Sequence, residues 1–230
     1  MRAPVSVIIP TLDAADELPA TLGALGEGLD AGLIRELIVS DGGSVDGTVR
    51  LAERAGAVLV SGPPSRGGQL MRGAAAAQGD WLLFLHADTH PGPGWGTVVL
   101  AHLADHPDDA GHFCLAFRAA GLAPRLVAGW ANLRSRVLGL PYGDQGLLIS
   151  RALYDRIGGY RDIPLMEDVA IARALKGRIR ALPATAYTGA IRFEQQGWLR
   201  RGARNLVLLA RFYLGTDPAK LSASYKRGRA

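Results

Sequence analysis

Four short apolar runs recur through the first ninety residues, and this repetition constrains the fold more than any other feature. The runs cover residues 6–11, 36–41, 57–61 and 81–85. Each run suits a buried strand, and each intervening segment has the spacing or composition of a helix. Regular strand–helix alternation predicts a parallel sheet with right-handed crossovers. We therefore expect an α/β fold, with a mostly parallel, mixed sheet flanked by helices.

The expected helices connect these runs and continue into a less regular second half. In the first half they cover residues 18–25, ended by Gly26 and Gly28, then about 45–55, capped by Ser44, and 66–77. In the second half, helices are expected over 95–103, 124–138, 166–176 and 198–214, and strands over 112–117 and 146–150. No linker of low complexity separates the halves, so we expect both to share one sheet.

Polar side chains follow three of the four runs at the point where each strand ends. They are Thr11, Asp41 and Asp88. Carboxyl ends of parallel strands lie along one edge, where open α/β sheets bind ligands. Asp88 then has two interpretations. It holds a divalent cation that binds a phosphate, or it only caps the turn after its strand.

Charge and cysteine content narrow the possible partners. The net charge is +5 over 230 residues, and residues 192–229 hold nine lysines or arginines against Glu194 and Asp217. This bias suits a phosphorylated ligand or an anionic membrane surface. The interleaved aromatic residues of a single-strand nucleic-acid binder are missing, so we expect no nucleic-acid partner. The single cysteine, Cys114, excludes an internal disulfide and a zinc site made only of cysteines.

Several common motifs are absent from the sequence. A Walker A loop and a strand-associated G-x-G-x-x-G motif are missing, as are zinc-binding spacings and a G-x-S-x-G elbow. The sequence therefore argues against a P-loop ATPase, a dehydrogenase with a standard Rossmann turn and a serine hydrolase. The first residues show no signal-peptide pattern, and no run reaches the roughly 18 apolar residues of a membrane span. We expect a cytoplasmic protein, with possible contact at the membrane periphery.

Three motifs in chain order carry a family resemblance. Residues 6–12, 41–48 and the strand that closes on 86–88 resemble the consecutive signatures of family 2 glycosyltransferases of the GT-A fold. The segments 66–70, 143–146 and 164–168 further resemble a small bacterial subgroup that is associated with radical-SAM or arsenosugar biosynthesis. The resemblance implies a single GT-A-like domain over 1–230. Its parts would be a nucleotide-binding half (1–90), an acceptor half (91–191) and a basic C-terminal helix and tail (192–230).

The resemblance assigns most of the donor site to the first half. It implies a nucleobase and ribose pocket lined by Pro10, Thr11, Leu12, Asp13, Glu17 and Ala87. Asp41 would accept a hydrogen bond from the base, commonly uracil, or it only forms the turn before two glycines. Asp46 is expected to order that turn. Arg66 and Arg192 would bind the phosphates, although Arg66 also fits a solvated surface arginine.

The metal and catalytic residues follow from the same resemblance. Asp88 would bind Mg²⁺ or Mn²⁺, but the usual acid-x-acid signature reads His86-Ala87-Asp88 in this chain. His86 then has three interpretations. It is a second metal ligand that favours Mn²⁺, a residue that positions the ligands without binding the metal, or simply the end of a capped strand. The catalytic base would be Asp168, with Glu167 beside it, unless both only complement the helix dipole.

The acceptor side is expected near one polar turn. Tyr142, Asp144 and Gln145 would line it, with Trp130 and Arg134 as neighbours. The resemblance implies an inverting transfer of one sugar from a nucleotide-diphosphate donor, with UDP as the expected nucleotide, to a small or lipid-linked acceptor. The processive Gln-x-x-Arg-Trp signature is absent.

Alternatives stay open at this point. The chain could be a nucleotide-sugar-binding or scaffold protein with a weakened metal site, or a nucleotidyltransferase. The amphipathic helix over 198–214 packs on its own domain or on a twin subunit in a homodimer, or it lies on a membrane with its arginines towards the headgroups.

Overall fold

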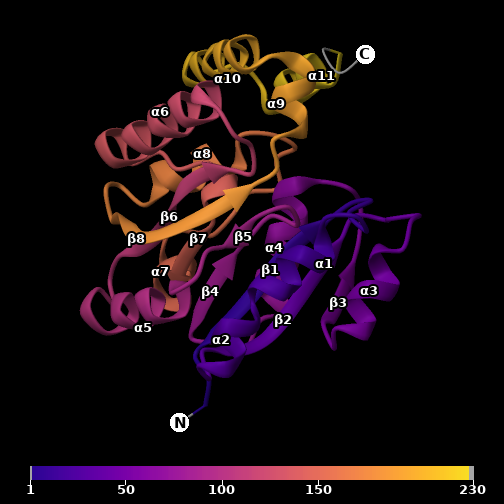
Figure 1. Ribbon diagram of the computed structural model, residues 1–230, viewed down its shortest axis with the longest axis vertical. Helices are drawn as coiled ribbons and strands as arrows, with labels where there is room; N and C mark the ends of the chain where they lie inside the picture. Colours follow the sequence, from indigo (N-terminus) through magenta and orange to yellow (C-terminus); the bar gives the residue numbers. More distant parts are fainter. Residues whose placement is uncertain (1, 228–230) are drawn as a thin grey trace.

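The computed structural model describes residues 2–227 and forms one eight-stranded sheet in the order β3-β2-β1-β4-β7-β6-β8-β5 (Figure 1). The strands are β1 (Val5–Thr11), β2 (Ile34–Asp41), β3 (Val58–Ser61), β4 (Trp81–Phe84), β5 (His90–Pro91), β6 (Ala110–Phe117), β7 (Leu147–Ser150) and β8 (Ile179–Thr188). The first four pair in parallel. In the second half β6 and β8 are parallel, whereas β7 runs antiparallel to both neighbours and β5 antiparallel to β8. The expected α/β fold with one shared, mixed sheet is confirmed.

Helices cover both faces of this sheet. They are α1 (Leu18–Ala24), α2 (Gly26–Asp30), α3 (Thr48–Arg54), α4 (Arg66–Ala76), α5 (Trp95–Asp105), α6 (Leu122–Leu138), α7 (Arg151–Arg156), α8 (Glu167–Ala174), α9 (Ile191–Gln196), α10 (Trp198–Tyr213) and α11 (Pro218–Arg227), with a 3₁₀ turn over Gly143–Gln145. Figure 1 shows α6, α9, α10 and α11 gathered at the end of the molecule that lies opposite the N-terminus. Across residues 2–227, no helix combines the length and the apolar character that a membrane crossing requires.

Alternation along the central strands builds a separate core on each face. In β1, Val7 and Ile9 pack with Trp95 under α1, α2 and α5, whereas Ile8 packs with Leu70 under α4. Successive side chains of a strand point to opposite faces, so a continuous apolar run fills both cores. This burial fixes the register that brings the carboxyl ends of β1, β2 and β4 together.

Two expectations about helices need correction, and one strand was missed. The helix expected from about residue 45 begins only at Thr48, because Ser44 is used inside the preceding loop and does not cap it. Gly26 opens α2 and does not terminate the helical region. The strand β8 was not expected. Its pairing with β6 shifts register between His112 and Cys114, opposite the stretch that contains Pro183.

One glycine contact links α4 to the loop before α8. A Cβ on Gly67 would lie 2.0 Å from the carbonyl oxygen of Arg161 and 2.8 Å from the nitrogen of Ile163. Both are backbone atoms, so the loop itself must move. We expect Gly67→Ala to lower the free energy of unfolding by about 1–3 kcal/mol, as overpacking does.

The matched control is Gly23→Ala in α1, where a Cβ meets nothing within 4 Å. That variant should raise stability by about 0.5–1 kcal/mol, because alanine favours a helix interior. Urea denaturation of both variants measures the two changes. If Gly67→Ala and wild type have the same free energy of unfolding, the 161–163 loop moves aside without cost and the prediction is wrong.

Candidate active site

Two loops at the carboxyl ends of β1 and β2 are joined by hydrogen bonds. The backbone nitrogen of Asp13 donates to Ser44 Oγ over 2.9 Å, and its carboxylate accepts from the nitrogen of Val45. Asp46 accepts from the nitrogens of Ala15 and Thr48. The hydroxyl of Thr48, which also donates to Asp46, and then these two backbone nitrogens lower the pKa of Asp46. Asp46 therefore orders the turn, as expected.

Asp41 lies at the centre of the same turn and is only 2% exposed. Its carboxylate accepts hydrogen bonds from Thr11 Oγ1, from Ser44 Oγ and from the nitrogens of Gly43 and Ser44. Although burial raises the pKa of Asp41, these donors together lower it. The structure thus gives Asp41 the turn-forming role, and its contact with a base stays a prediction.

A cleft opens past the end of β4. It encloses about 880 Å³ when the open solvent at its mouth is included. Its lining includes the predicted residues Arg66, His86, Asp88, Tyr142, Asp144, Glu167, Asp168 and Arg192. Residues far apart in sequence therefore converge as expected, with Asp88 and Asp168 in one cavity. Thr11 and Asp41 pair with each other outside that lining.

Arg66 is fixed from two sides at the start of α4. Its Nε lies 3.3 Å from Glu167 Oε1, and its Nη2 lies 3.3 Å from His86 Nδ1. A guanidinium only donates, so Nδ1 accepts and the proton of a neutral His86 sits on Nε2. Burial, and then the charges of Arg66 and Arg192, keep the pKa of His86 well below its usual value. The side chain of Arg66 stays 40% exposed, so it can still meet a ligand.

The same geometry bears on His86 as a metal ligand. A Cβ on Gly143 would lie 2.4 Å from His86 Nε2, so the second ring nitrogen packs against the 143 backbone. With Nδ1 engaged by Arg66, the contacts of His86 are those of a supporting group. Direct ligation by His86 stays untested.

Glu167 and Asp168 begin α8 but occupy different environments. Glu167 is buried, and burial raises its pKa to about 7 against the opposing charge of Arg66. Asp168 reaches the cleft, where its Oδ2 accepts from the nitrogen of Gly143 over 3.0 Å. Met166, just before them, adopts a left-handed conformation with φ 68°, which is uncommon outside glycine. Backbone strain of this kind often accompanies functional sites.

The acceptor-side expectations are met only in part. Tyr142 lines the cleft under the guanidinium of Arg134, whose Cζ is 3.4 Å from the ring centroid. Gln145 is instead fully buried, and its amide bonds to Ser135 and to the carbonyl of Phe113. Gln145 therefore holds the turn from inside and does not line the cleft, so its contact with an acceptor stays a prediction without support from its position. Trp130 is exposed on α6 and is not part of the cleft lining.

The remaining nucleotide-pocket residues lie around the first loop. Leu12 is half-exposed, and Ala87 packs on the core while its carbonyl accepts from Thr21 Oγ1. Glu17 pairs with Arg118 over 2.8 Å. A Cβ on Gly189 would lie 3.3 Å from both Arg118 Nη2 and Asp88 Oδ2, so the absent side chain leaves room for both groups.

The cleft offers oxygen donors for a hard cation. Asp144 Oδ1 is buried with no hydrogen-bond partner, and Asp88 and Asp168 line the same cavity. Within residues 2–227, no cluster of three acidic, histidine or cysteine side chains has the geometry of a complete metal site. The residues present therefore fit Mg²⁺ or Mn²⁺ that completes its shell with phosphate oxygens and water.

Sequence reasoning missed one wall of the cleft. Residues from β8, α10 and α11 line it, among them Thr188, Arg201, Asn205 and Tyr225. Arg201 is buried, and its guanidinium donates to Gln196 and to the hydroxyl of Tyr225. The only available signal was the arginine content of the 198–214 segment.

Comparison with known proteins decides the family. Residues 6–125, more than half of the chain, match the family described as Glycosyl transferase family 2. The chain belongs to glycosyltransferase family 2.

Curated members of glycosyltransferase family 2 match the chain in part. A glucosyl-3-phosphoglycerate synthase of Mycolicibacterium paratuberculosis is 37% identical over 93 residues, 36% of this chain and 28% of the relative. A PGL/p-HBAD biosynthesis glycosyltransferase of Mycobacterium tuberculosis is 38% identical over 96 residues, 38% of this chain and 37% of the relative. The matched region thus spans about a third of these relatives.

Solved structures of the family share the fold. Glucosyl-3-phosphoglycerate synthase from Mycobacterium tuberculosis, in complex with phosphoglyceric acid, superposes with a TM-score of 0.56 at 24% identity. The match covers 81% of this chain and 70% of that one. The S. aureus TarS 1–349 structure gives 0.61 at 15% identity, over 93% of this chain and 66% of that one. The GT-A architecture is therefore shown.

Asp144 gives the glycosyltransferase a pH-dependent stability that can be measured. Burial, together with Asp168 and Asp88, raises the pKa of Asp144 to about 6, although Arg134 opposes the shift. The folded state keeps this proton up to about pH 6, whereas the unfolded chain releases it near pH 4. This contribution to stability is therefore complete below about pH 4 and is lost as the pH rises through 6.

We expect Asp144→Asn to remove that loss. The measurement is a series of thermal melting curves without ligand. The difference in Tm between the variant and wild type should increase from pH 4 to 6.5 and then stay constant. A constant difference across this range would contradict the raised pKa.

Proposed function

We propose that this protein is a metal-dependent, inverting glycosyltransferase that moves one sugar from a UDP-linked donor to a small or lipid-linked acceptor. The observation that carries the proposal is the presence of Asp88 and Asp168 in one cleft, together with Arg66 and Arg192. Phosphate-binding cations and a candidate base thus surround one cavity. The structural relatives support UDP, since TarS and the mycobacterial synthase have been solved in complex with UDP.

Each group then has one role in the transfer. Asp168 takes the proton of the acceptor hydroxyl, whose oxygen attacks the anomeric carbon as the bond to the diphosphate breaks. Single displacement inverts that carbon. Arg66 and Arg192 bind the departing diphosphate through charge-assisted hydrogen bonds. Asp88 would hold a Mg²⁺ or Mn²⁺ ion, with Asp144 nearby, and the bound ion neutralises charge on the diphosphate.

The two halves divide this work in the proposal. The bonded loops over 12–15 and 42–48 form the nucleotide end, and the second half supplies Tyr142 and Asp168 on the acceptor side. We assign the chain to the radical-SAM- or arsenosugar-associated subgroup as part of the same proposal. It is supported by contact among the three subgroup segments, since Arg66 pairs with Glu167 and Gly143 bonds Asp168.

The test is release of UDP from a panel of UDP-sugars with Mn²⁺ or Mg²⁺, measured with and without an acceptor extract. We expect release from one or few donors, and only with the cation present. A thermal-shift screen with the same ligands reports binding separately. UDP binding without release from any donor would favour a nucleotide-sugar-binding protein instead.

A further inference from the structure

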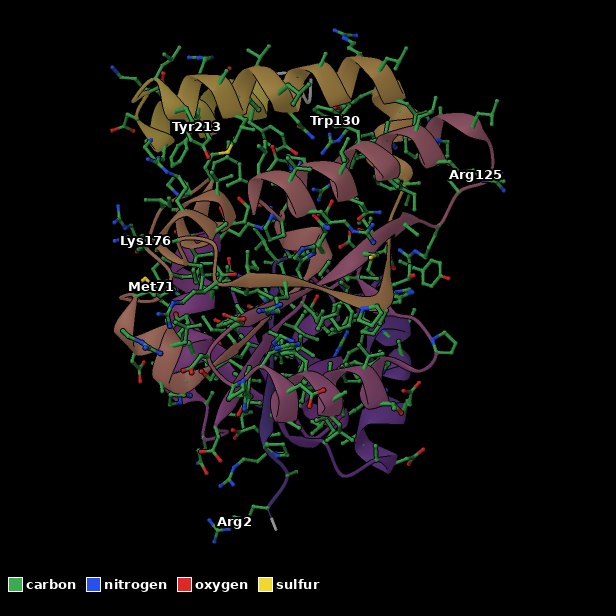
Figure 2. All side chains as sticks on the ribbon, turned by 90° about the vertical axis from the view of Figure 1, so that its left-hand side faces the viewer. Arg2, Met71, Arg125, Trp130, Lys176 and Tyr213 are labelled. Atoms are coloured by element: carbon green, nitrogen blue, oxygen red, sulfur yellow. The ribbon has the colours of Figure 1, made fainter. Side chains whose placement is uncertain are left out.

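The outer side of α6 carries an unbroken apolar stripe. Its members recur at the spacing of one helix face and are between 52 and 76% exposed: Leu122, Leu126, Trp130, Leu133 and Val137. The opposite side of α6 is buried through Ala128 and Ala131 against β6. The stripe is therefore the free face of a firmly packed helix. Figure 2 shows α6 alongside α10, with Trp130 and Arg125 labelled on it.

Neighbouring α10 repeats this arrangement. Its large apolar residues Leu199, Leu206, Val207, Tyr213 and Leu214 are between 42 and 85% exposed. Ala203 and Ala210 are exposed between them, and Arg200 is exposed at the edge of this apolar face. Arg201 points inward instead, into bonds with Gln196 and Tyr225. The helix thus presents its apolar side to the outside, the reverse of an ordinary surface helix.

The two helices pack against each other, so their outer faces adjoin. Together the ten large side chains above form what we call the α6–α10 surface. Contiguous apolar surface of this kind on a globular protein marks an interaction site.

The charges around the α6–α10 surface identify the occupant. Residues 121–138 and 195–216 contain seven arginines and no acid, and two of the seven, Arg134 and Arg201, are buried. Arg125 and Arg136 are exposed on one flank of α6, and Arg200 is exposed on α10. An apolar face flanked by arginines is the pattern of a helix that lies in the plane of an anionic membrane surface. A symmetric dimer would bring the same arginines together, with acids only beyond the two ends of α10, at Glu194 and Asp217.

We propose that the α6–α10 surface docks the protein on an anionic lipid bilayer, with the leucines in the interface and the arginines on phosphate headgroups. This surface is independent of the glycosyl transfer proposed above. The inner side of α10 does line the cleft through Arg201, Asn205 and Leu208. Docking would therefore bring the cleft close to the bilayer.

The test is flotation of the full chain with vesicles of phosphatidylcholine alone or of equimolar phosphatidylcholine and phosphatidylglycerol, without any sugar donor. We expect recovery with the mixed vesicles and much less with phosphatidylcholine alone. Raising the ionic strength to about 1 M, where the Debye length is about 3 Å, should weaken binding. Equal recovery on both vesicle types, or none on either, would overturn the proposal.

Two double variants, one on each helix, separate the surface from folding defects. Leu126→Gln with Trp130→Gln, and Leu199→Gln with Leu206→Gln, should each lower partition to the mixed vesicles at least about tenfold. The matched control is Leu29→Gln with Leu100→Gln, which alters exposed leucines on α2 and α5. Circular dichroism confirms that each variant folds. Unchanged partition of both surface variants would overturn the assignment.

A second copy of the chain is the competing occupant. Sedimentation equilibrium tests this possibility. If the wild-type chain is a dimer and the Leu126→Gln, Trp130→Gln variant is a monomer, the α6–α10 surface lies in the dimer interface. A dimer of that kind with no recovery on vesicles would overturn membrane docking.

Discussion

We expect Asp168→Asn to lower turnover by about two to four orders of magnitude and to leave donor binding unchanged. A general base contributes about 10²–10⁴ in rate, and asparagine cannot take the acceptor proton at neutral pH. The amide oxygen of Asn still accepts from the nitrogen of Gly143, which holds the wild-type carboxylate at 3.0 Å. The loss should therefore appear in kcat, with the Kd for UDP close to that of wild type.

The matched control for Asp168→Asn is Asp108→Asn, an exposed carboxylate whose side chain is 80% exposed. Steady-state kinetics and calorimetric titration with UDP give the two measurements. Wild-type kcat in Asp168→Asn would remove Asp168 from the role of base.

We expect Asp88→Ala to abolish the dependence of nucleotide binding on Mn²⁺ or Mg²⁺. Asp88 lines the cleft, and its carboxylate lies against Gly189, which has no side chain to cover it. In the variant, the protein no longer offers the Asp88 carboxylate to a metal ion. The Kd for UDP should therefore no longer fall as the metal concentration rises. Calorimetric titrations of UDP over a metal series measure this.

The companion variant His86→Asn tests whether His86 or Asp88 of the His86-Ala87-Asp88 signature is responsible for the response to metal. The ring of His86 is engaged by Arg66 and packed on Gly143, so its loss should disturb Arg66 and leave the metal response in place. A metal response that disappears with His86→Asn and survives Asp88→Ala would reverse the assignment.

The first half of the fold was predictable because its strands and helices are local. Continuous apolar runs such as 81–85 identify buried strands without knowledge of their neighbours, and parallel pairing brings their ends to one edge. The meeting of Asp88 and Asp168 in one cleft followed from that rule together with the family resemblance.

The second half was harder to predict because tertiary contacts override local pattern there. Pro183 interrupts β8 at a register shift, and proline in a strand is normally evidence against one. The burial of Arg201 depends on Gln196 and on Tyr225, a residue of a separate helix. Gln145 reads as a cleft residue in sequence, but its partners Ser135 and Phe113 draw it inside.

The cleft joins Arg66 of α4 to Tyr225 of α11, close to the end of the chain. The two sides of the cleft therefore come from segments that are remote in sequence, and contacts of this kind are slow to form during folding. Assembly of the first-half strands alone would leave the cleft open on the side that carries Tyr225.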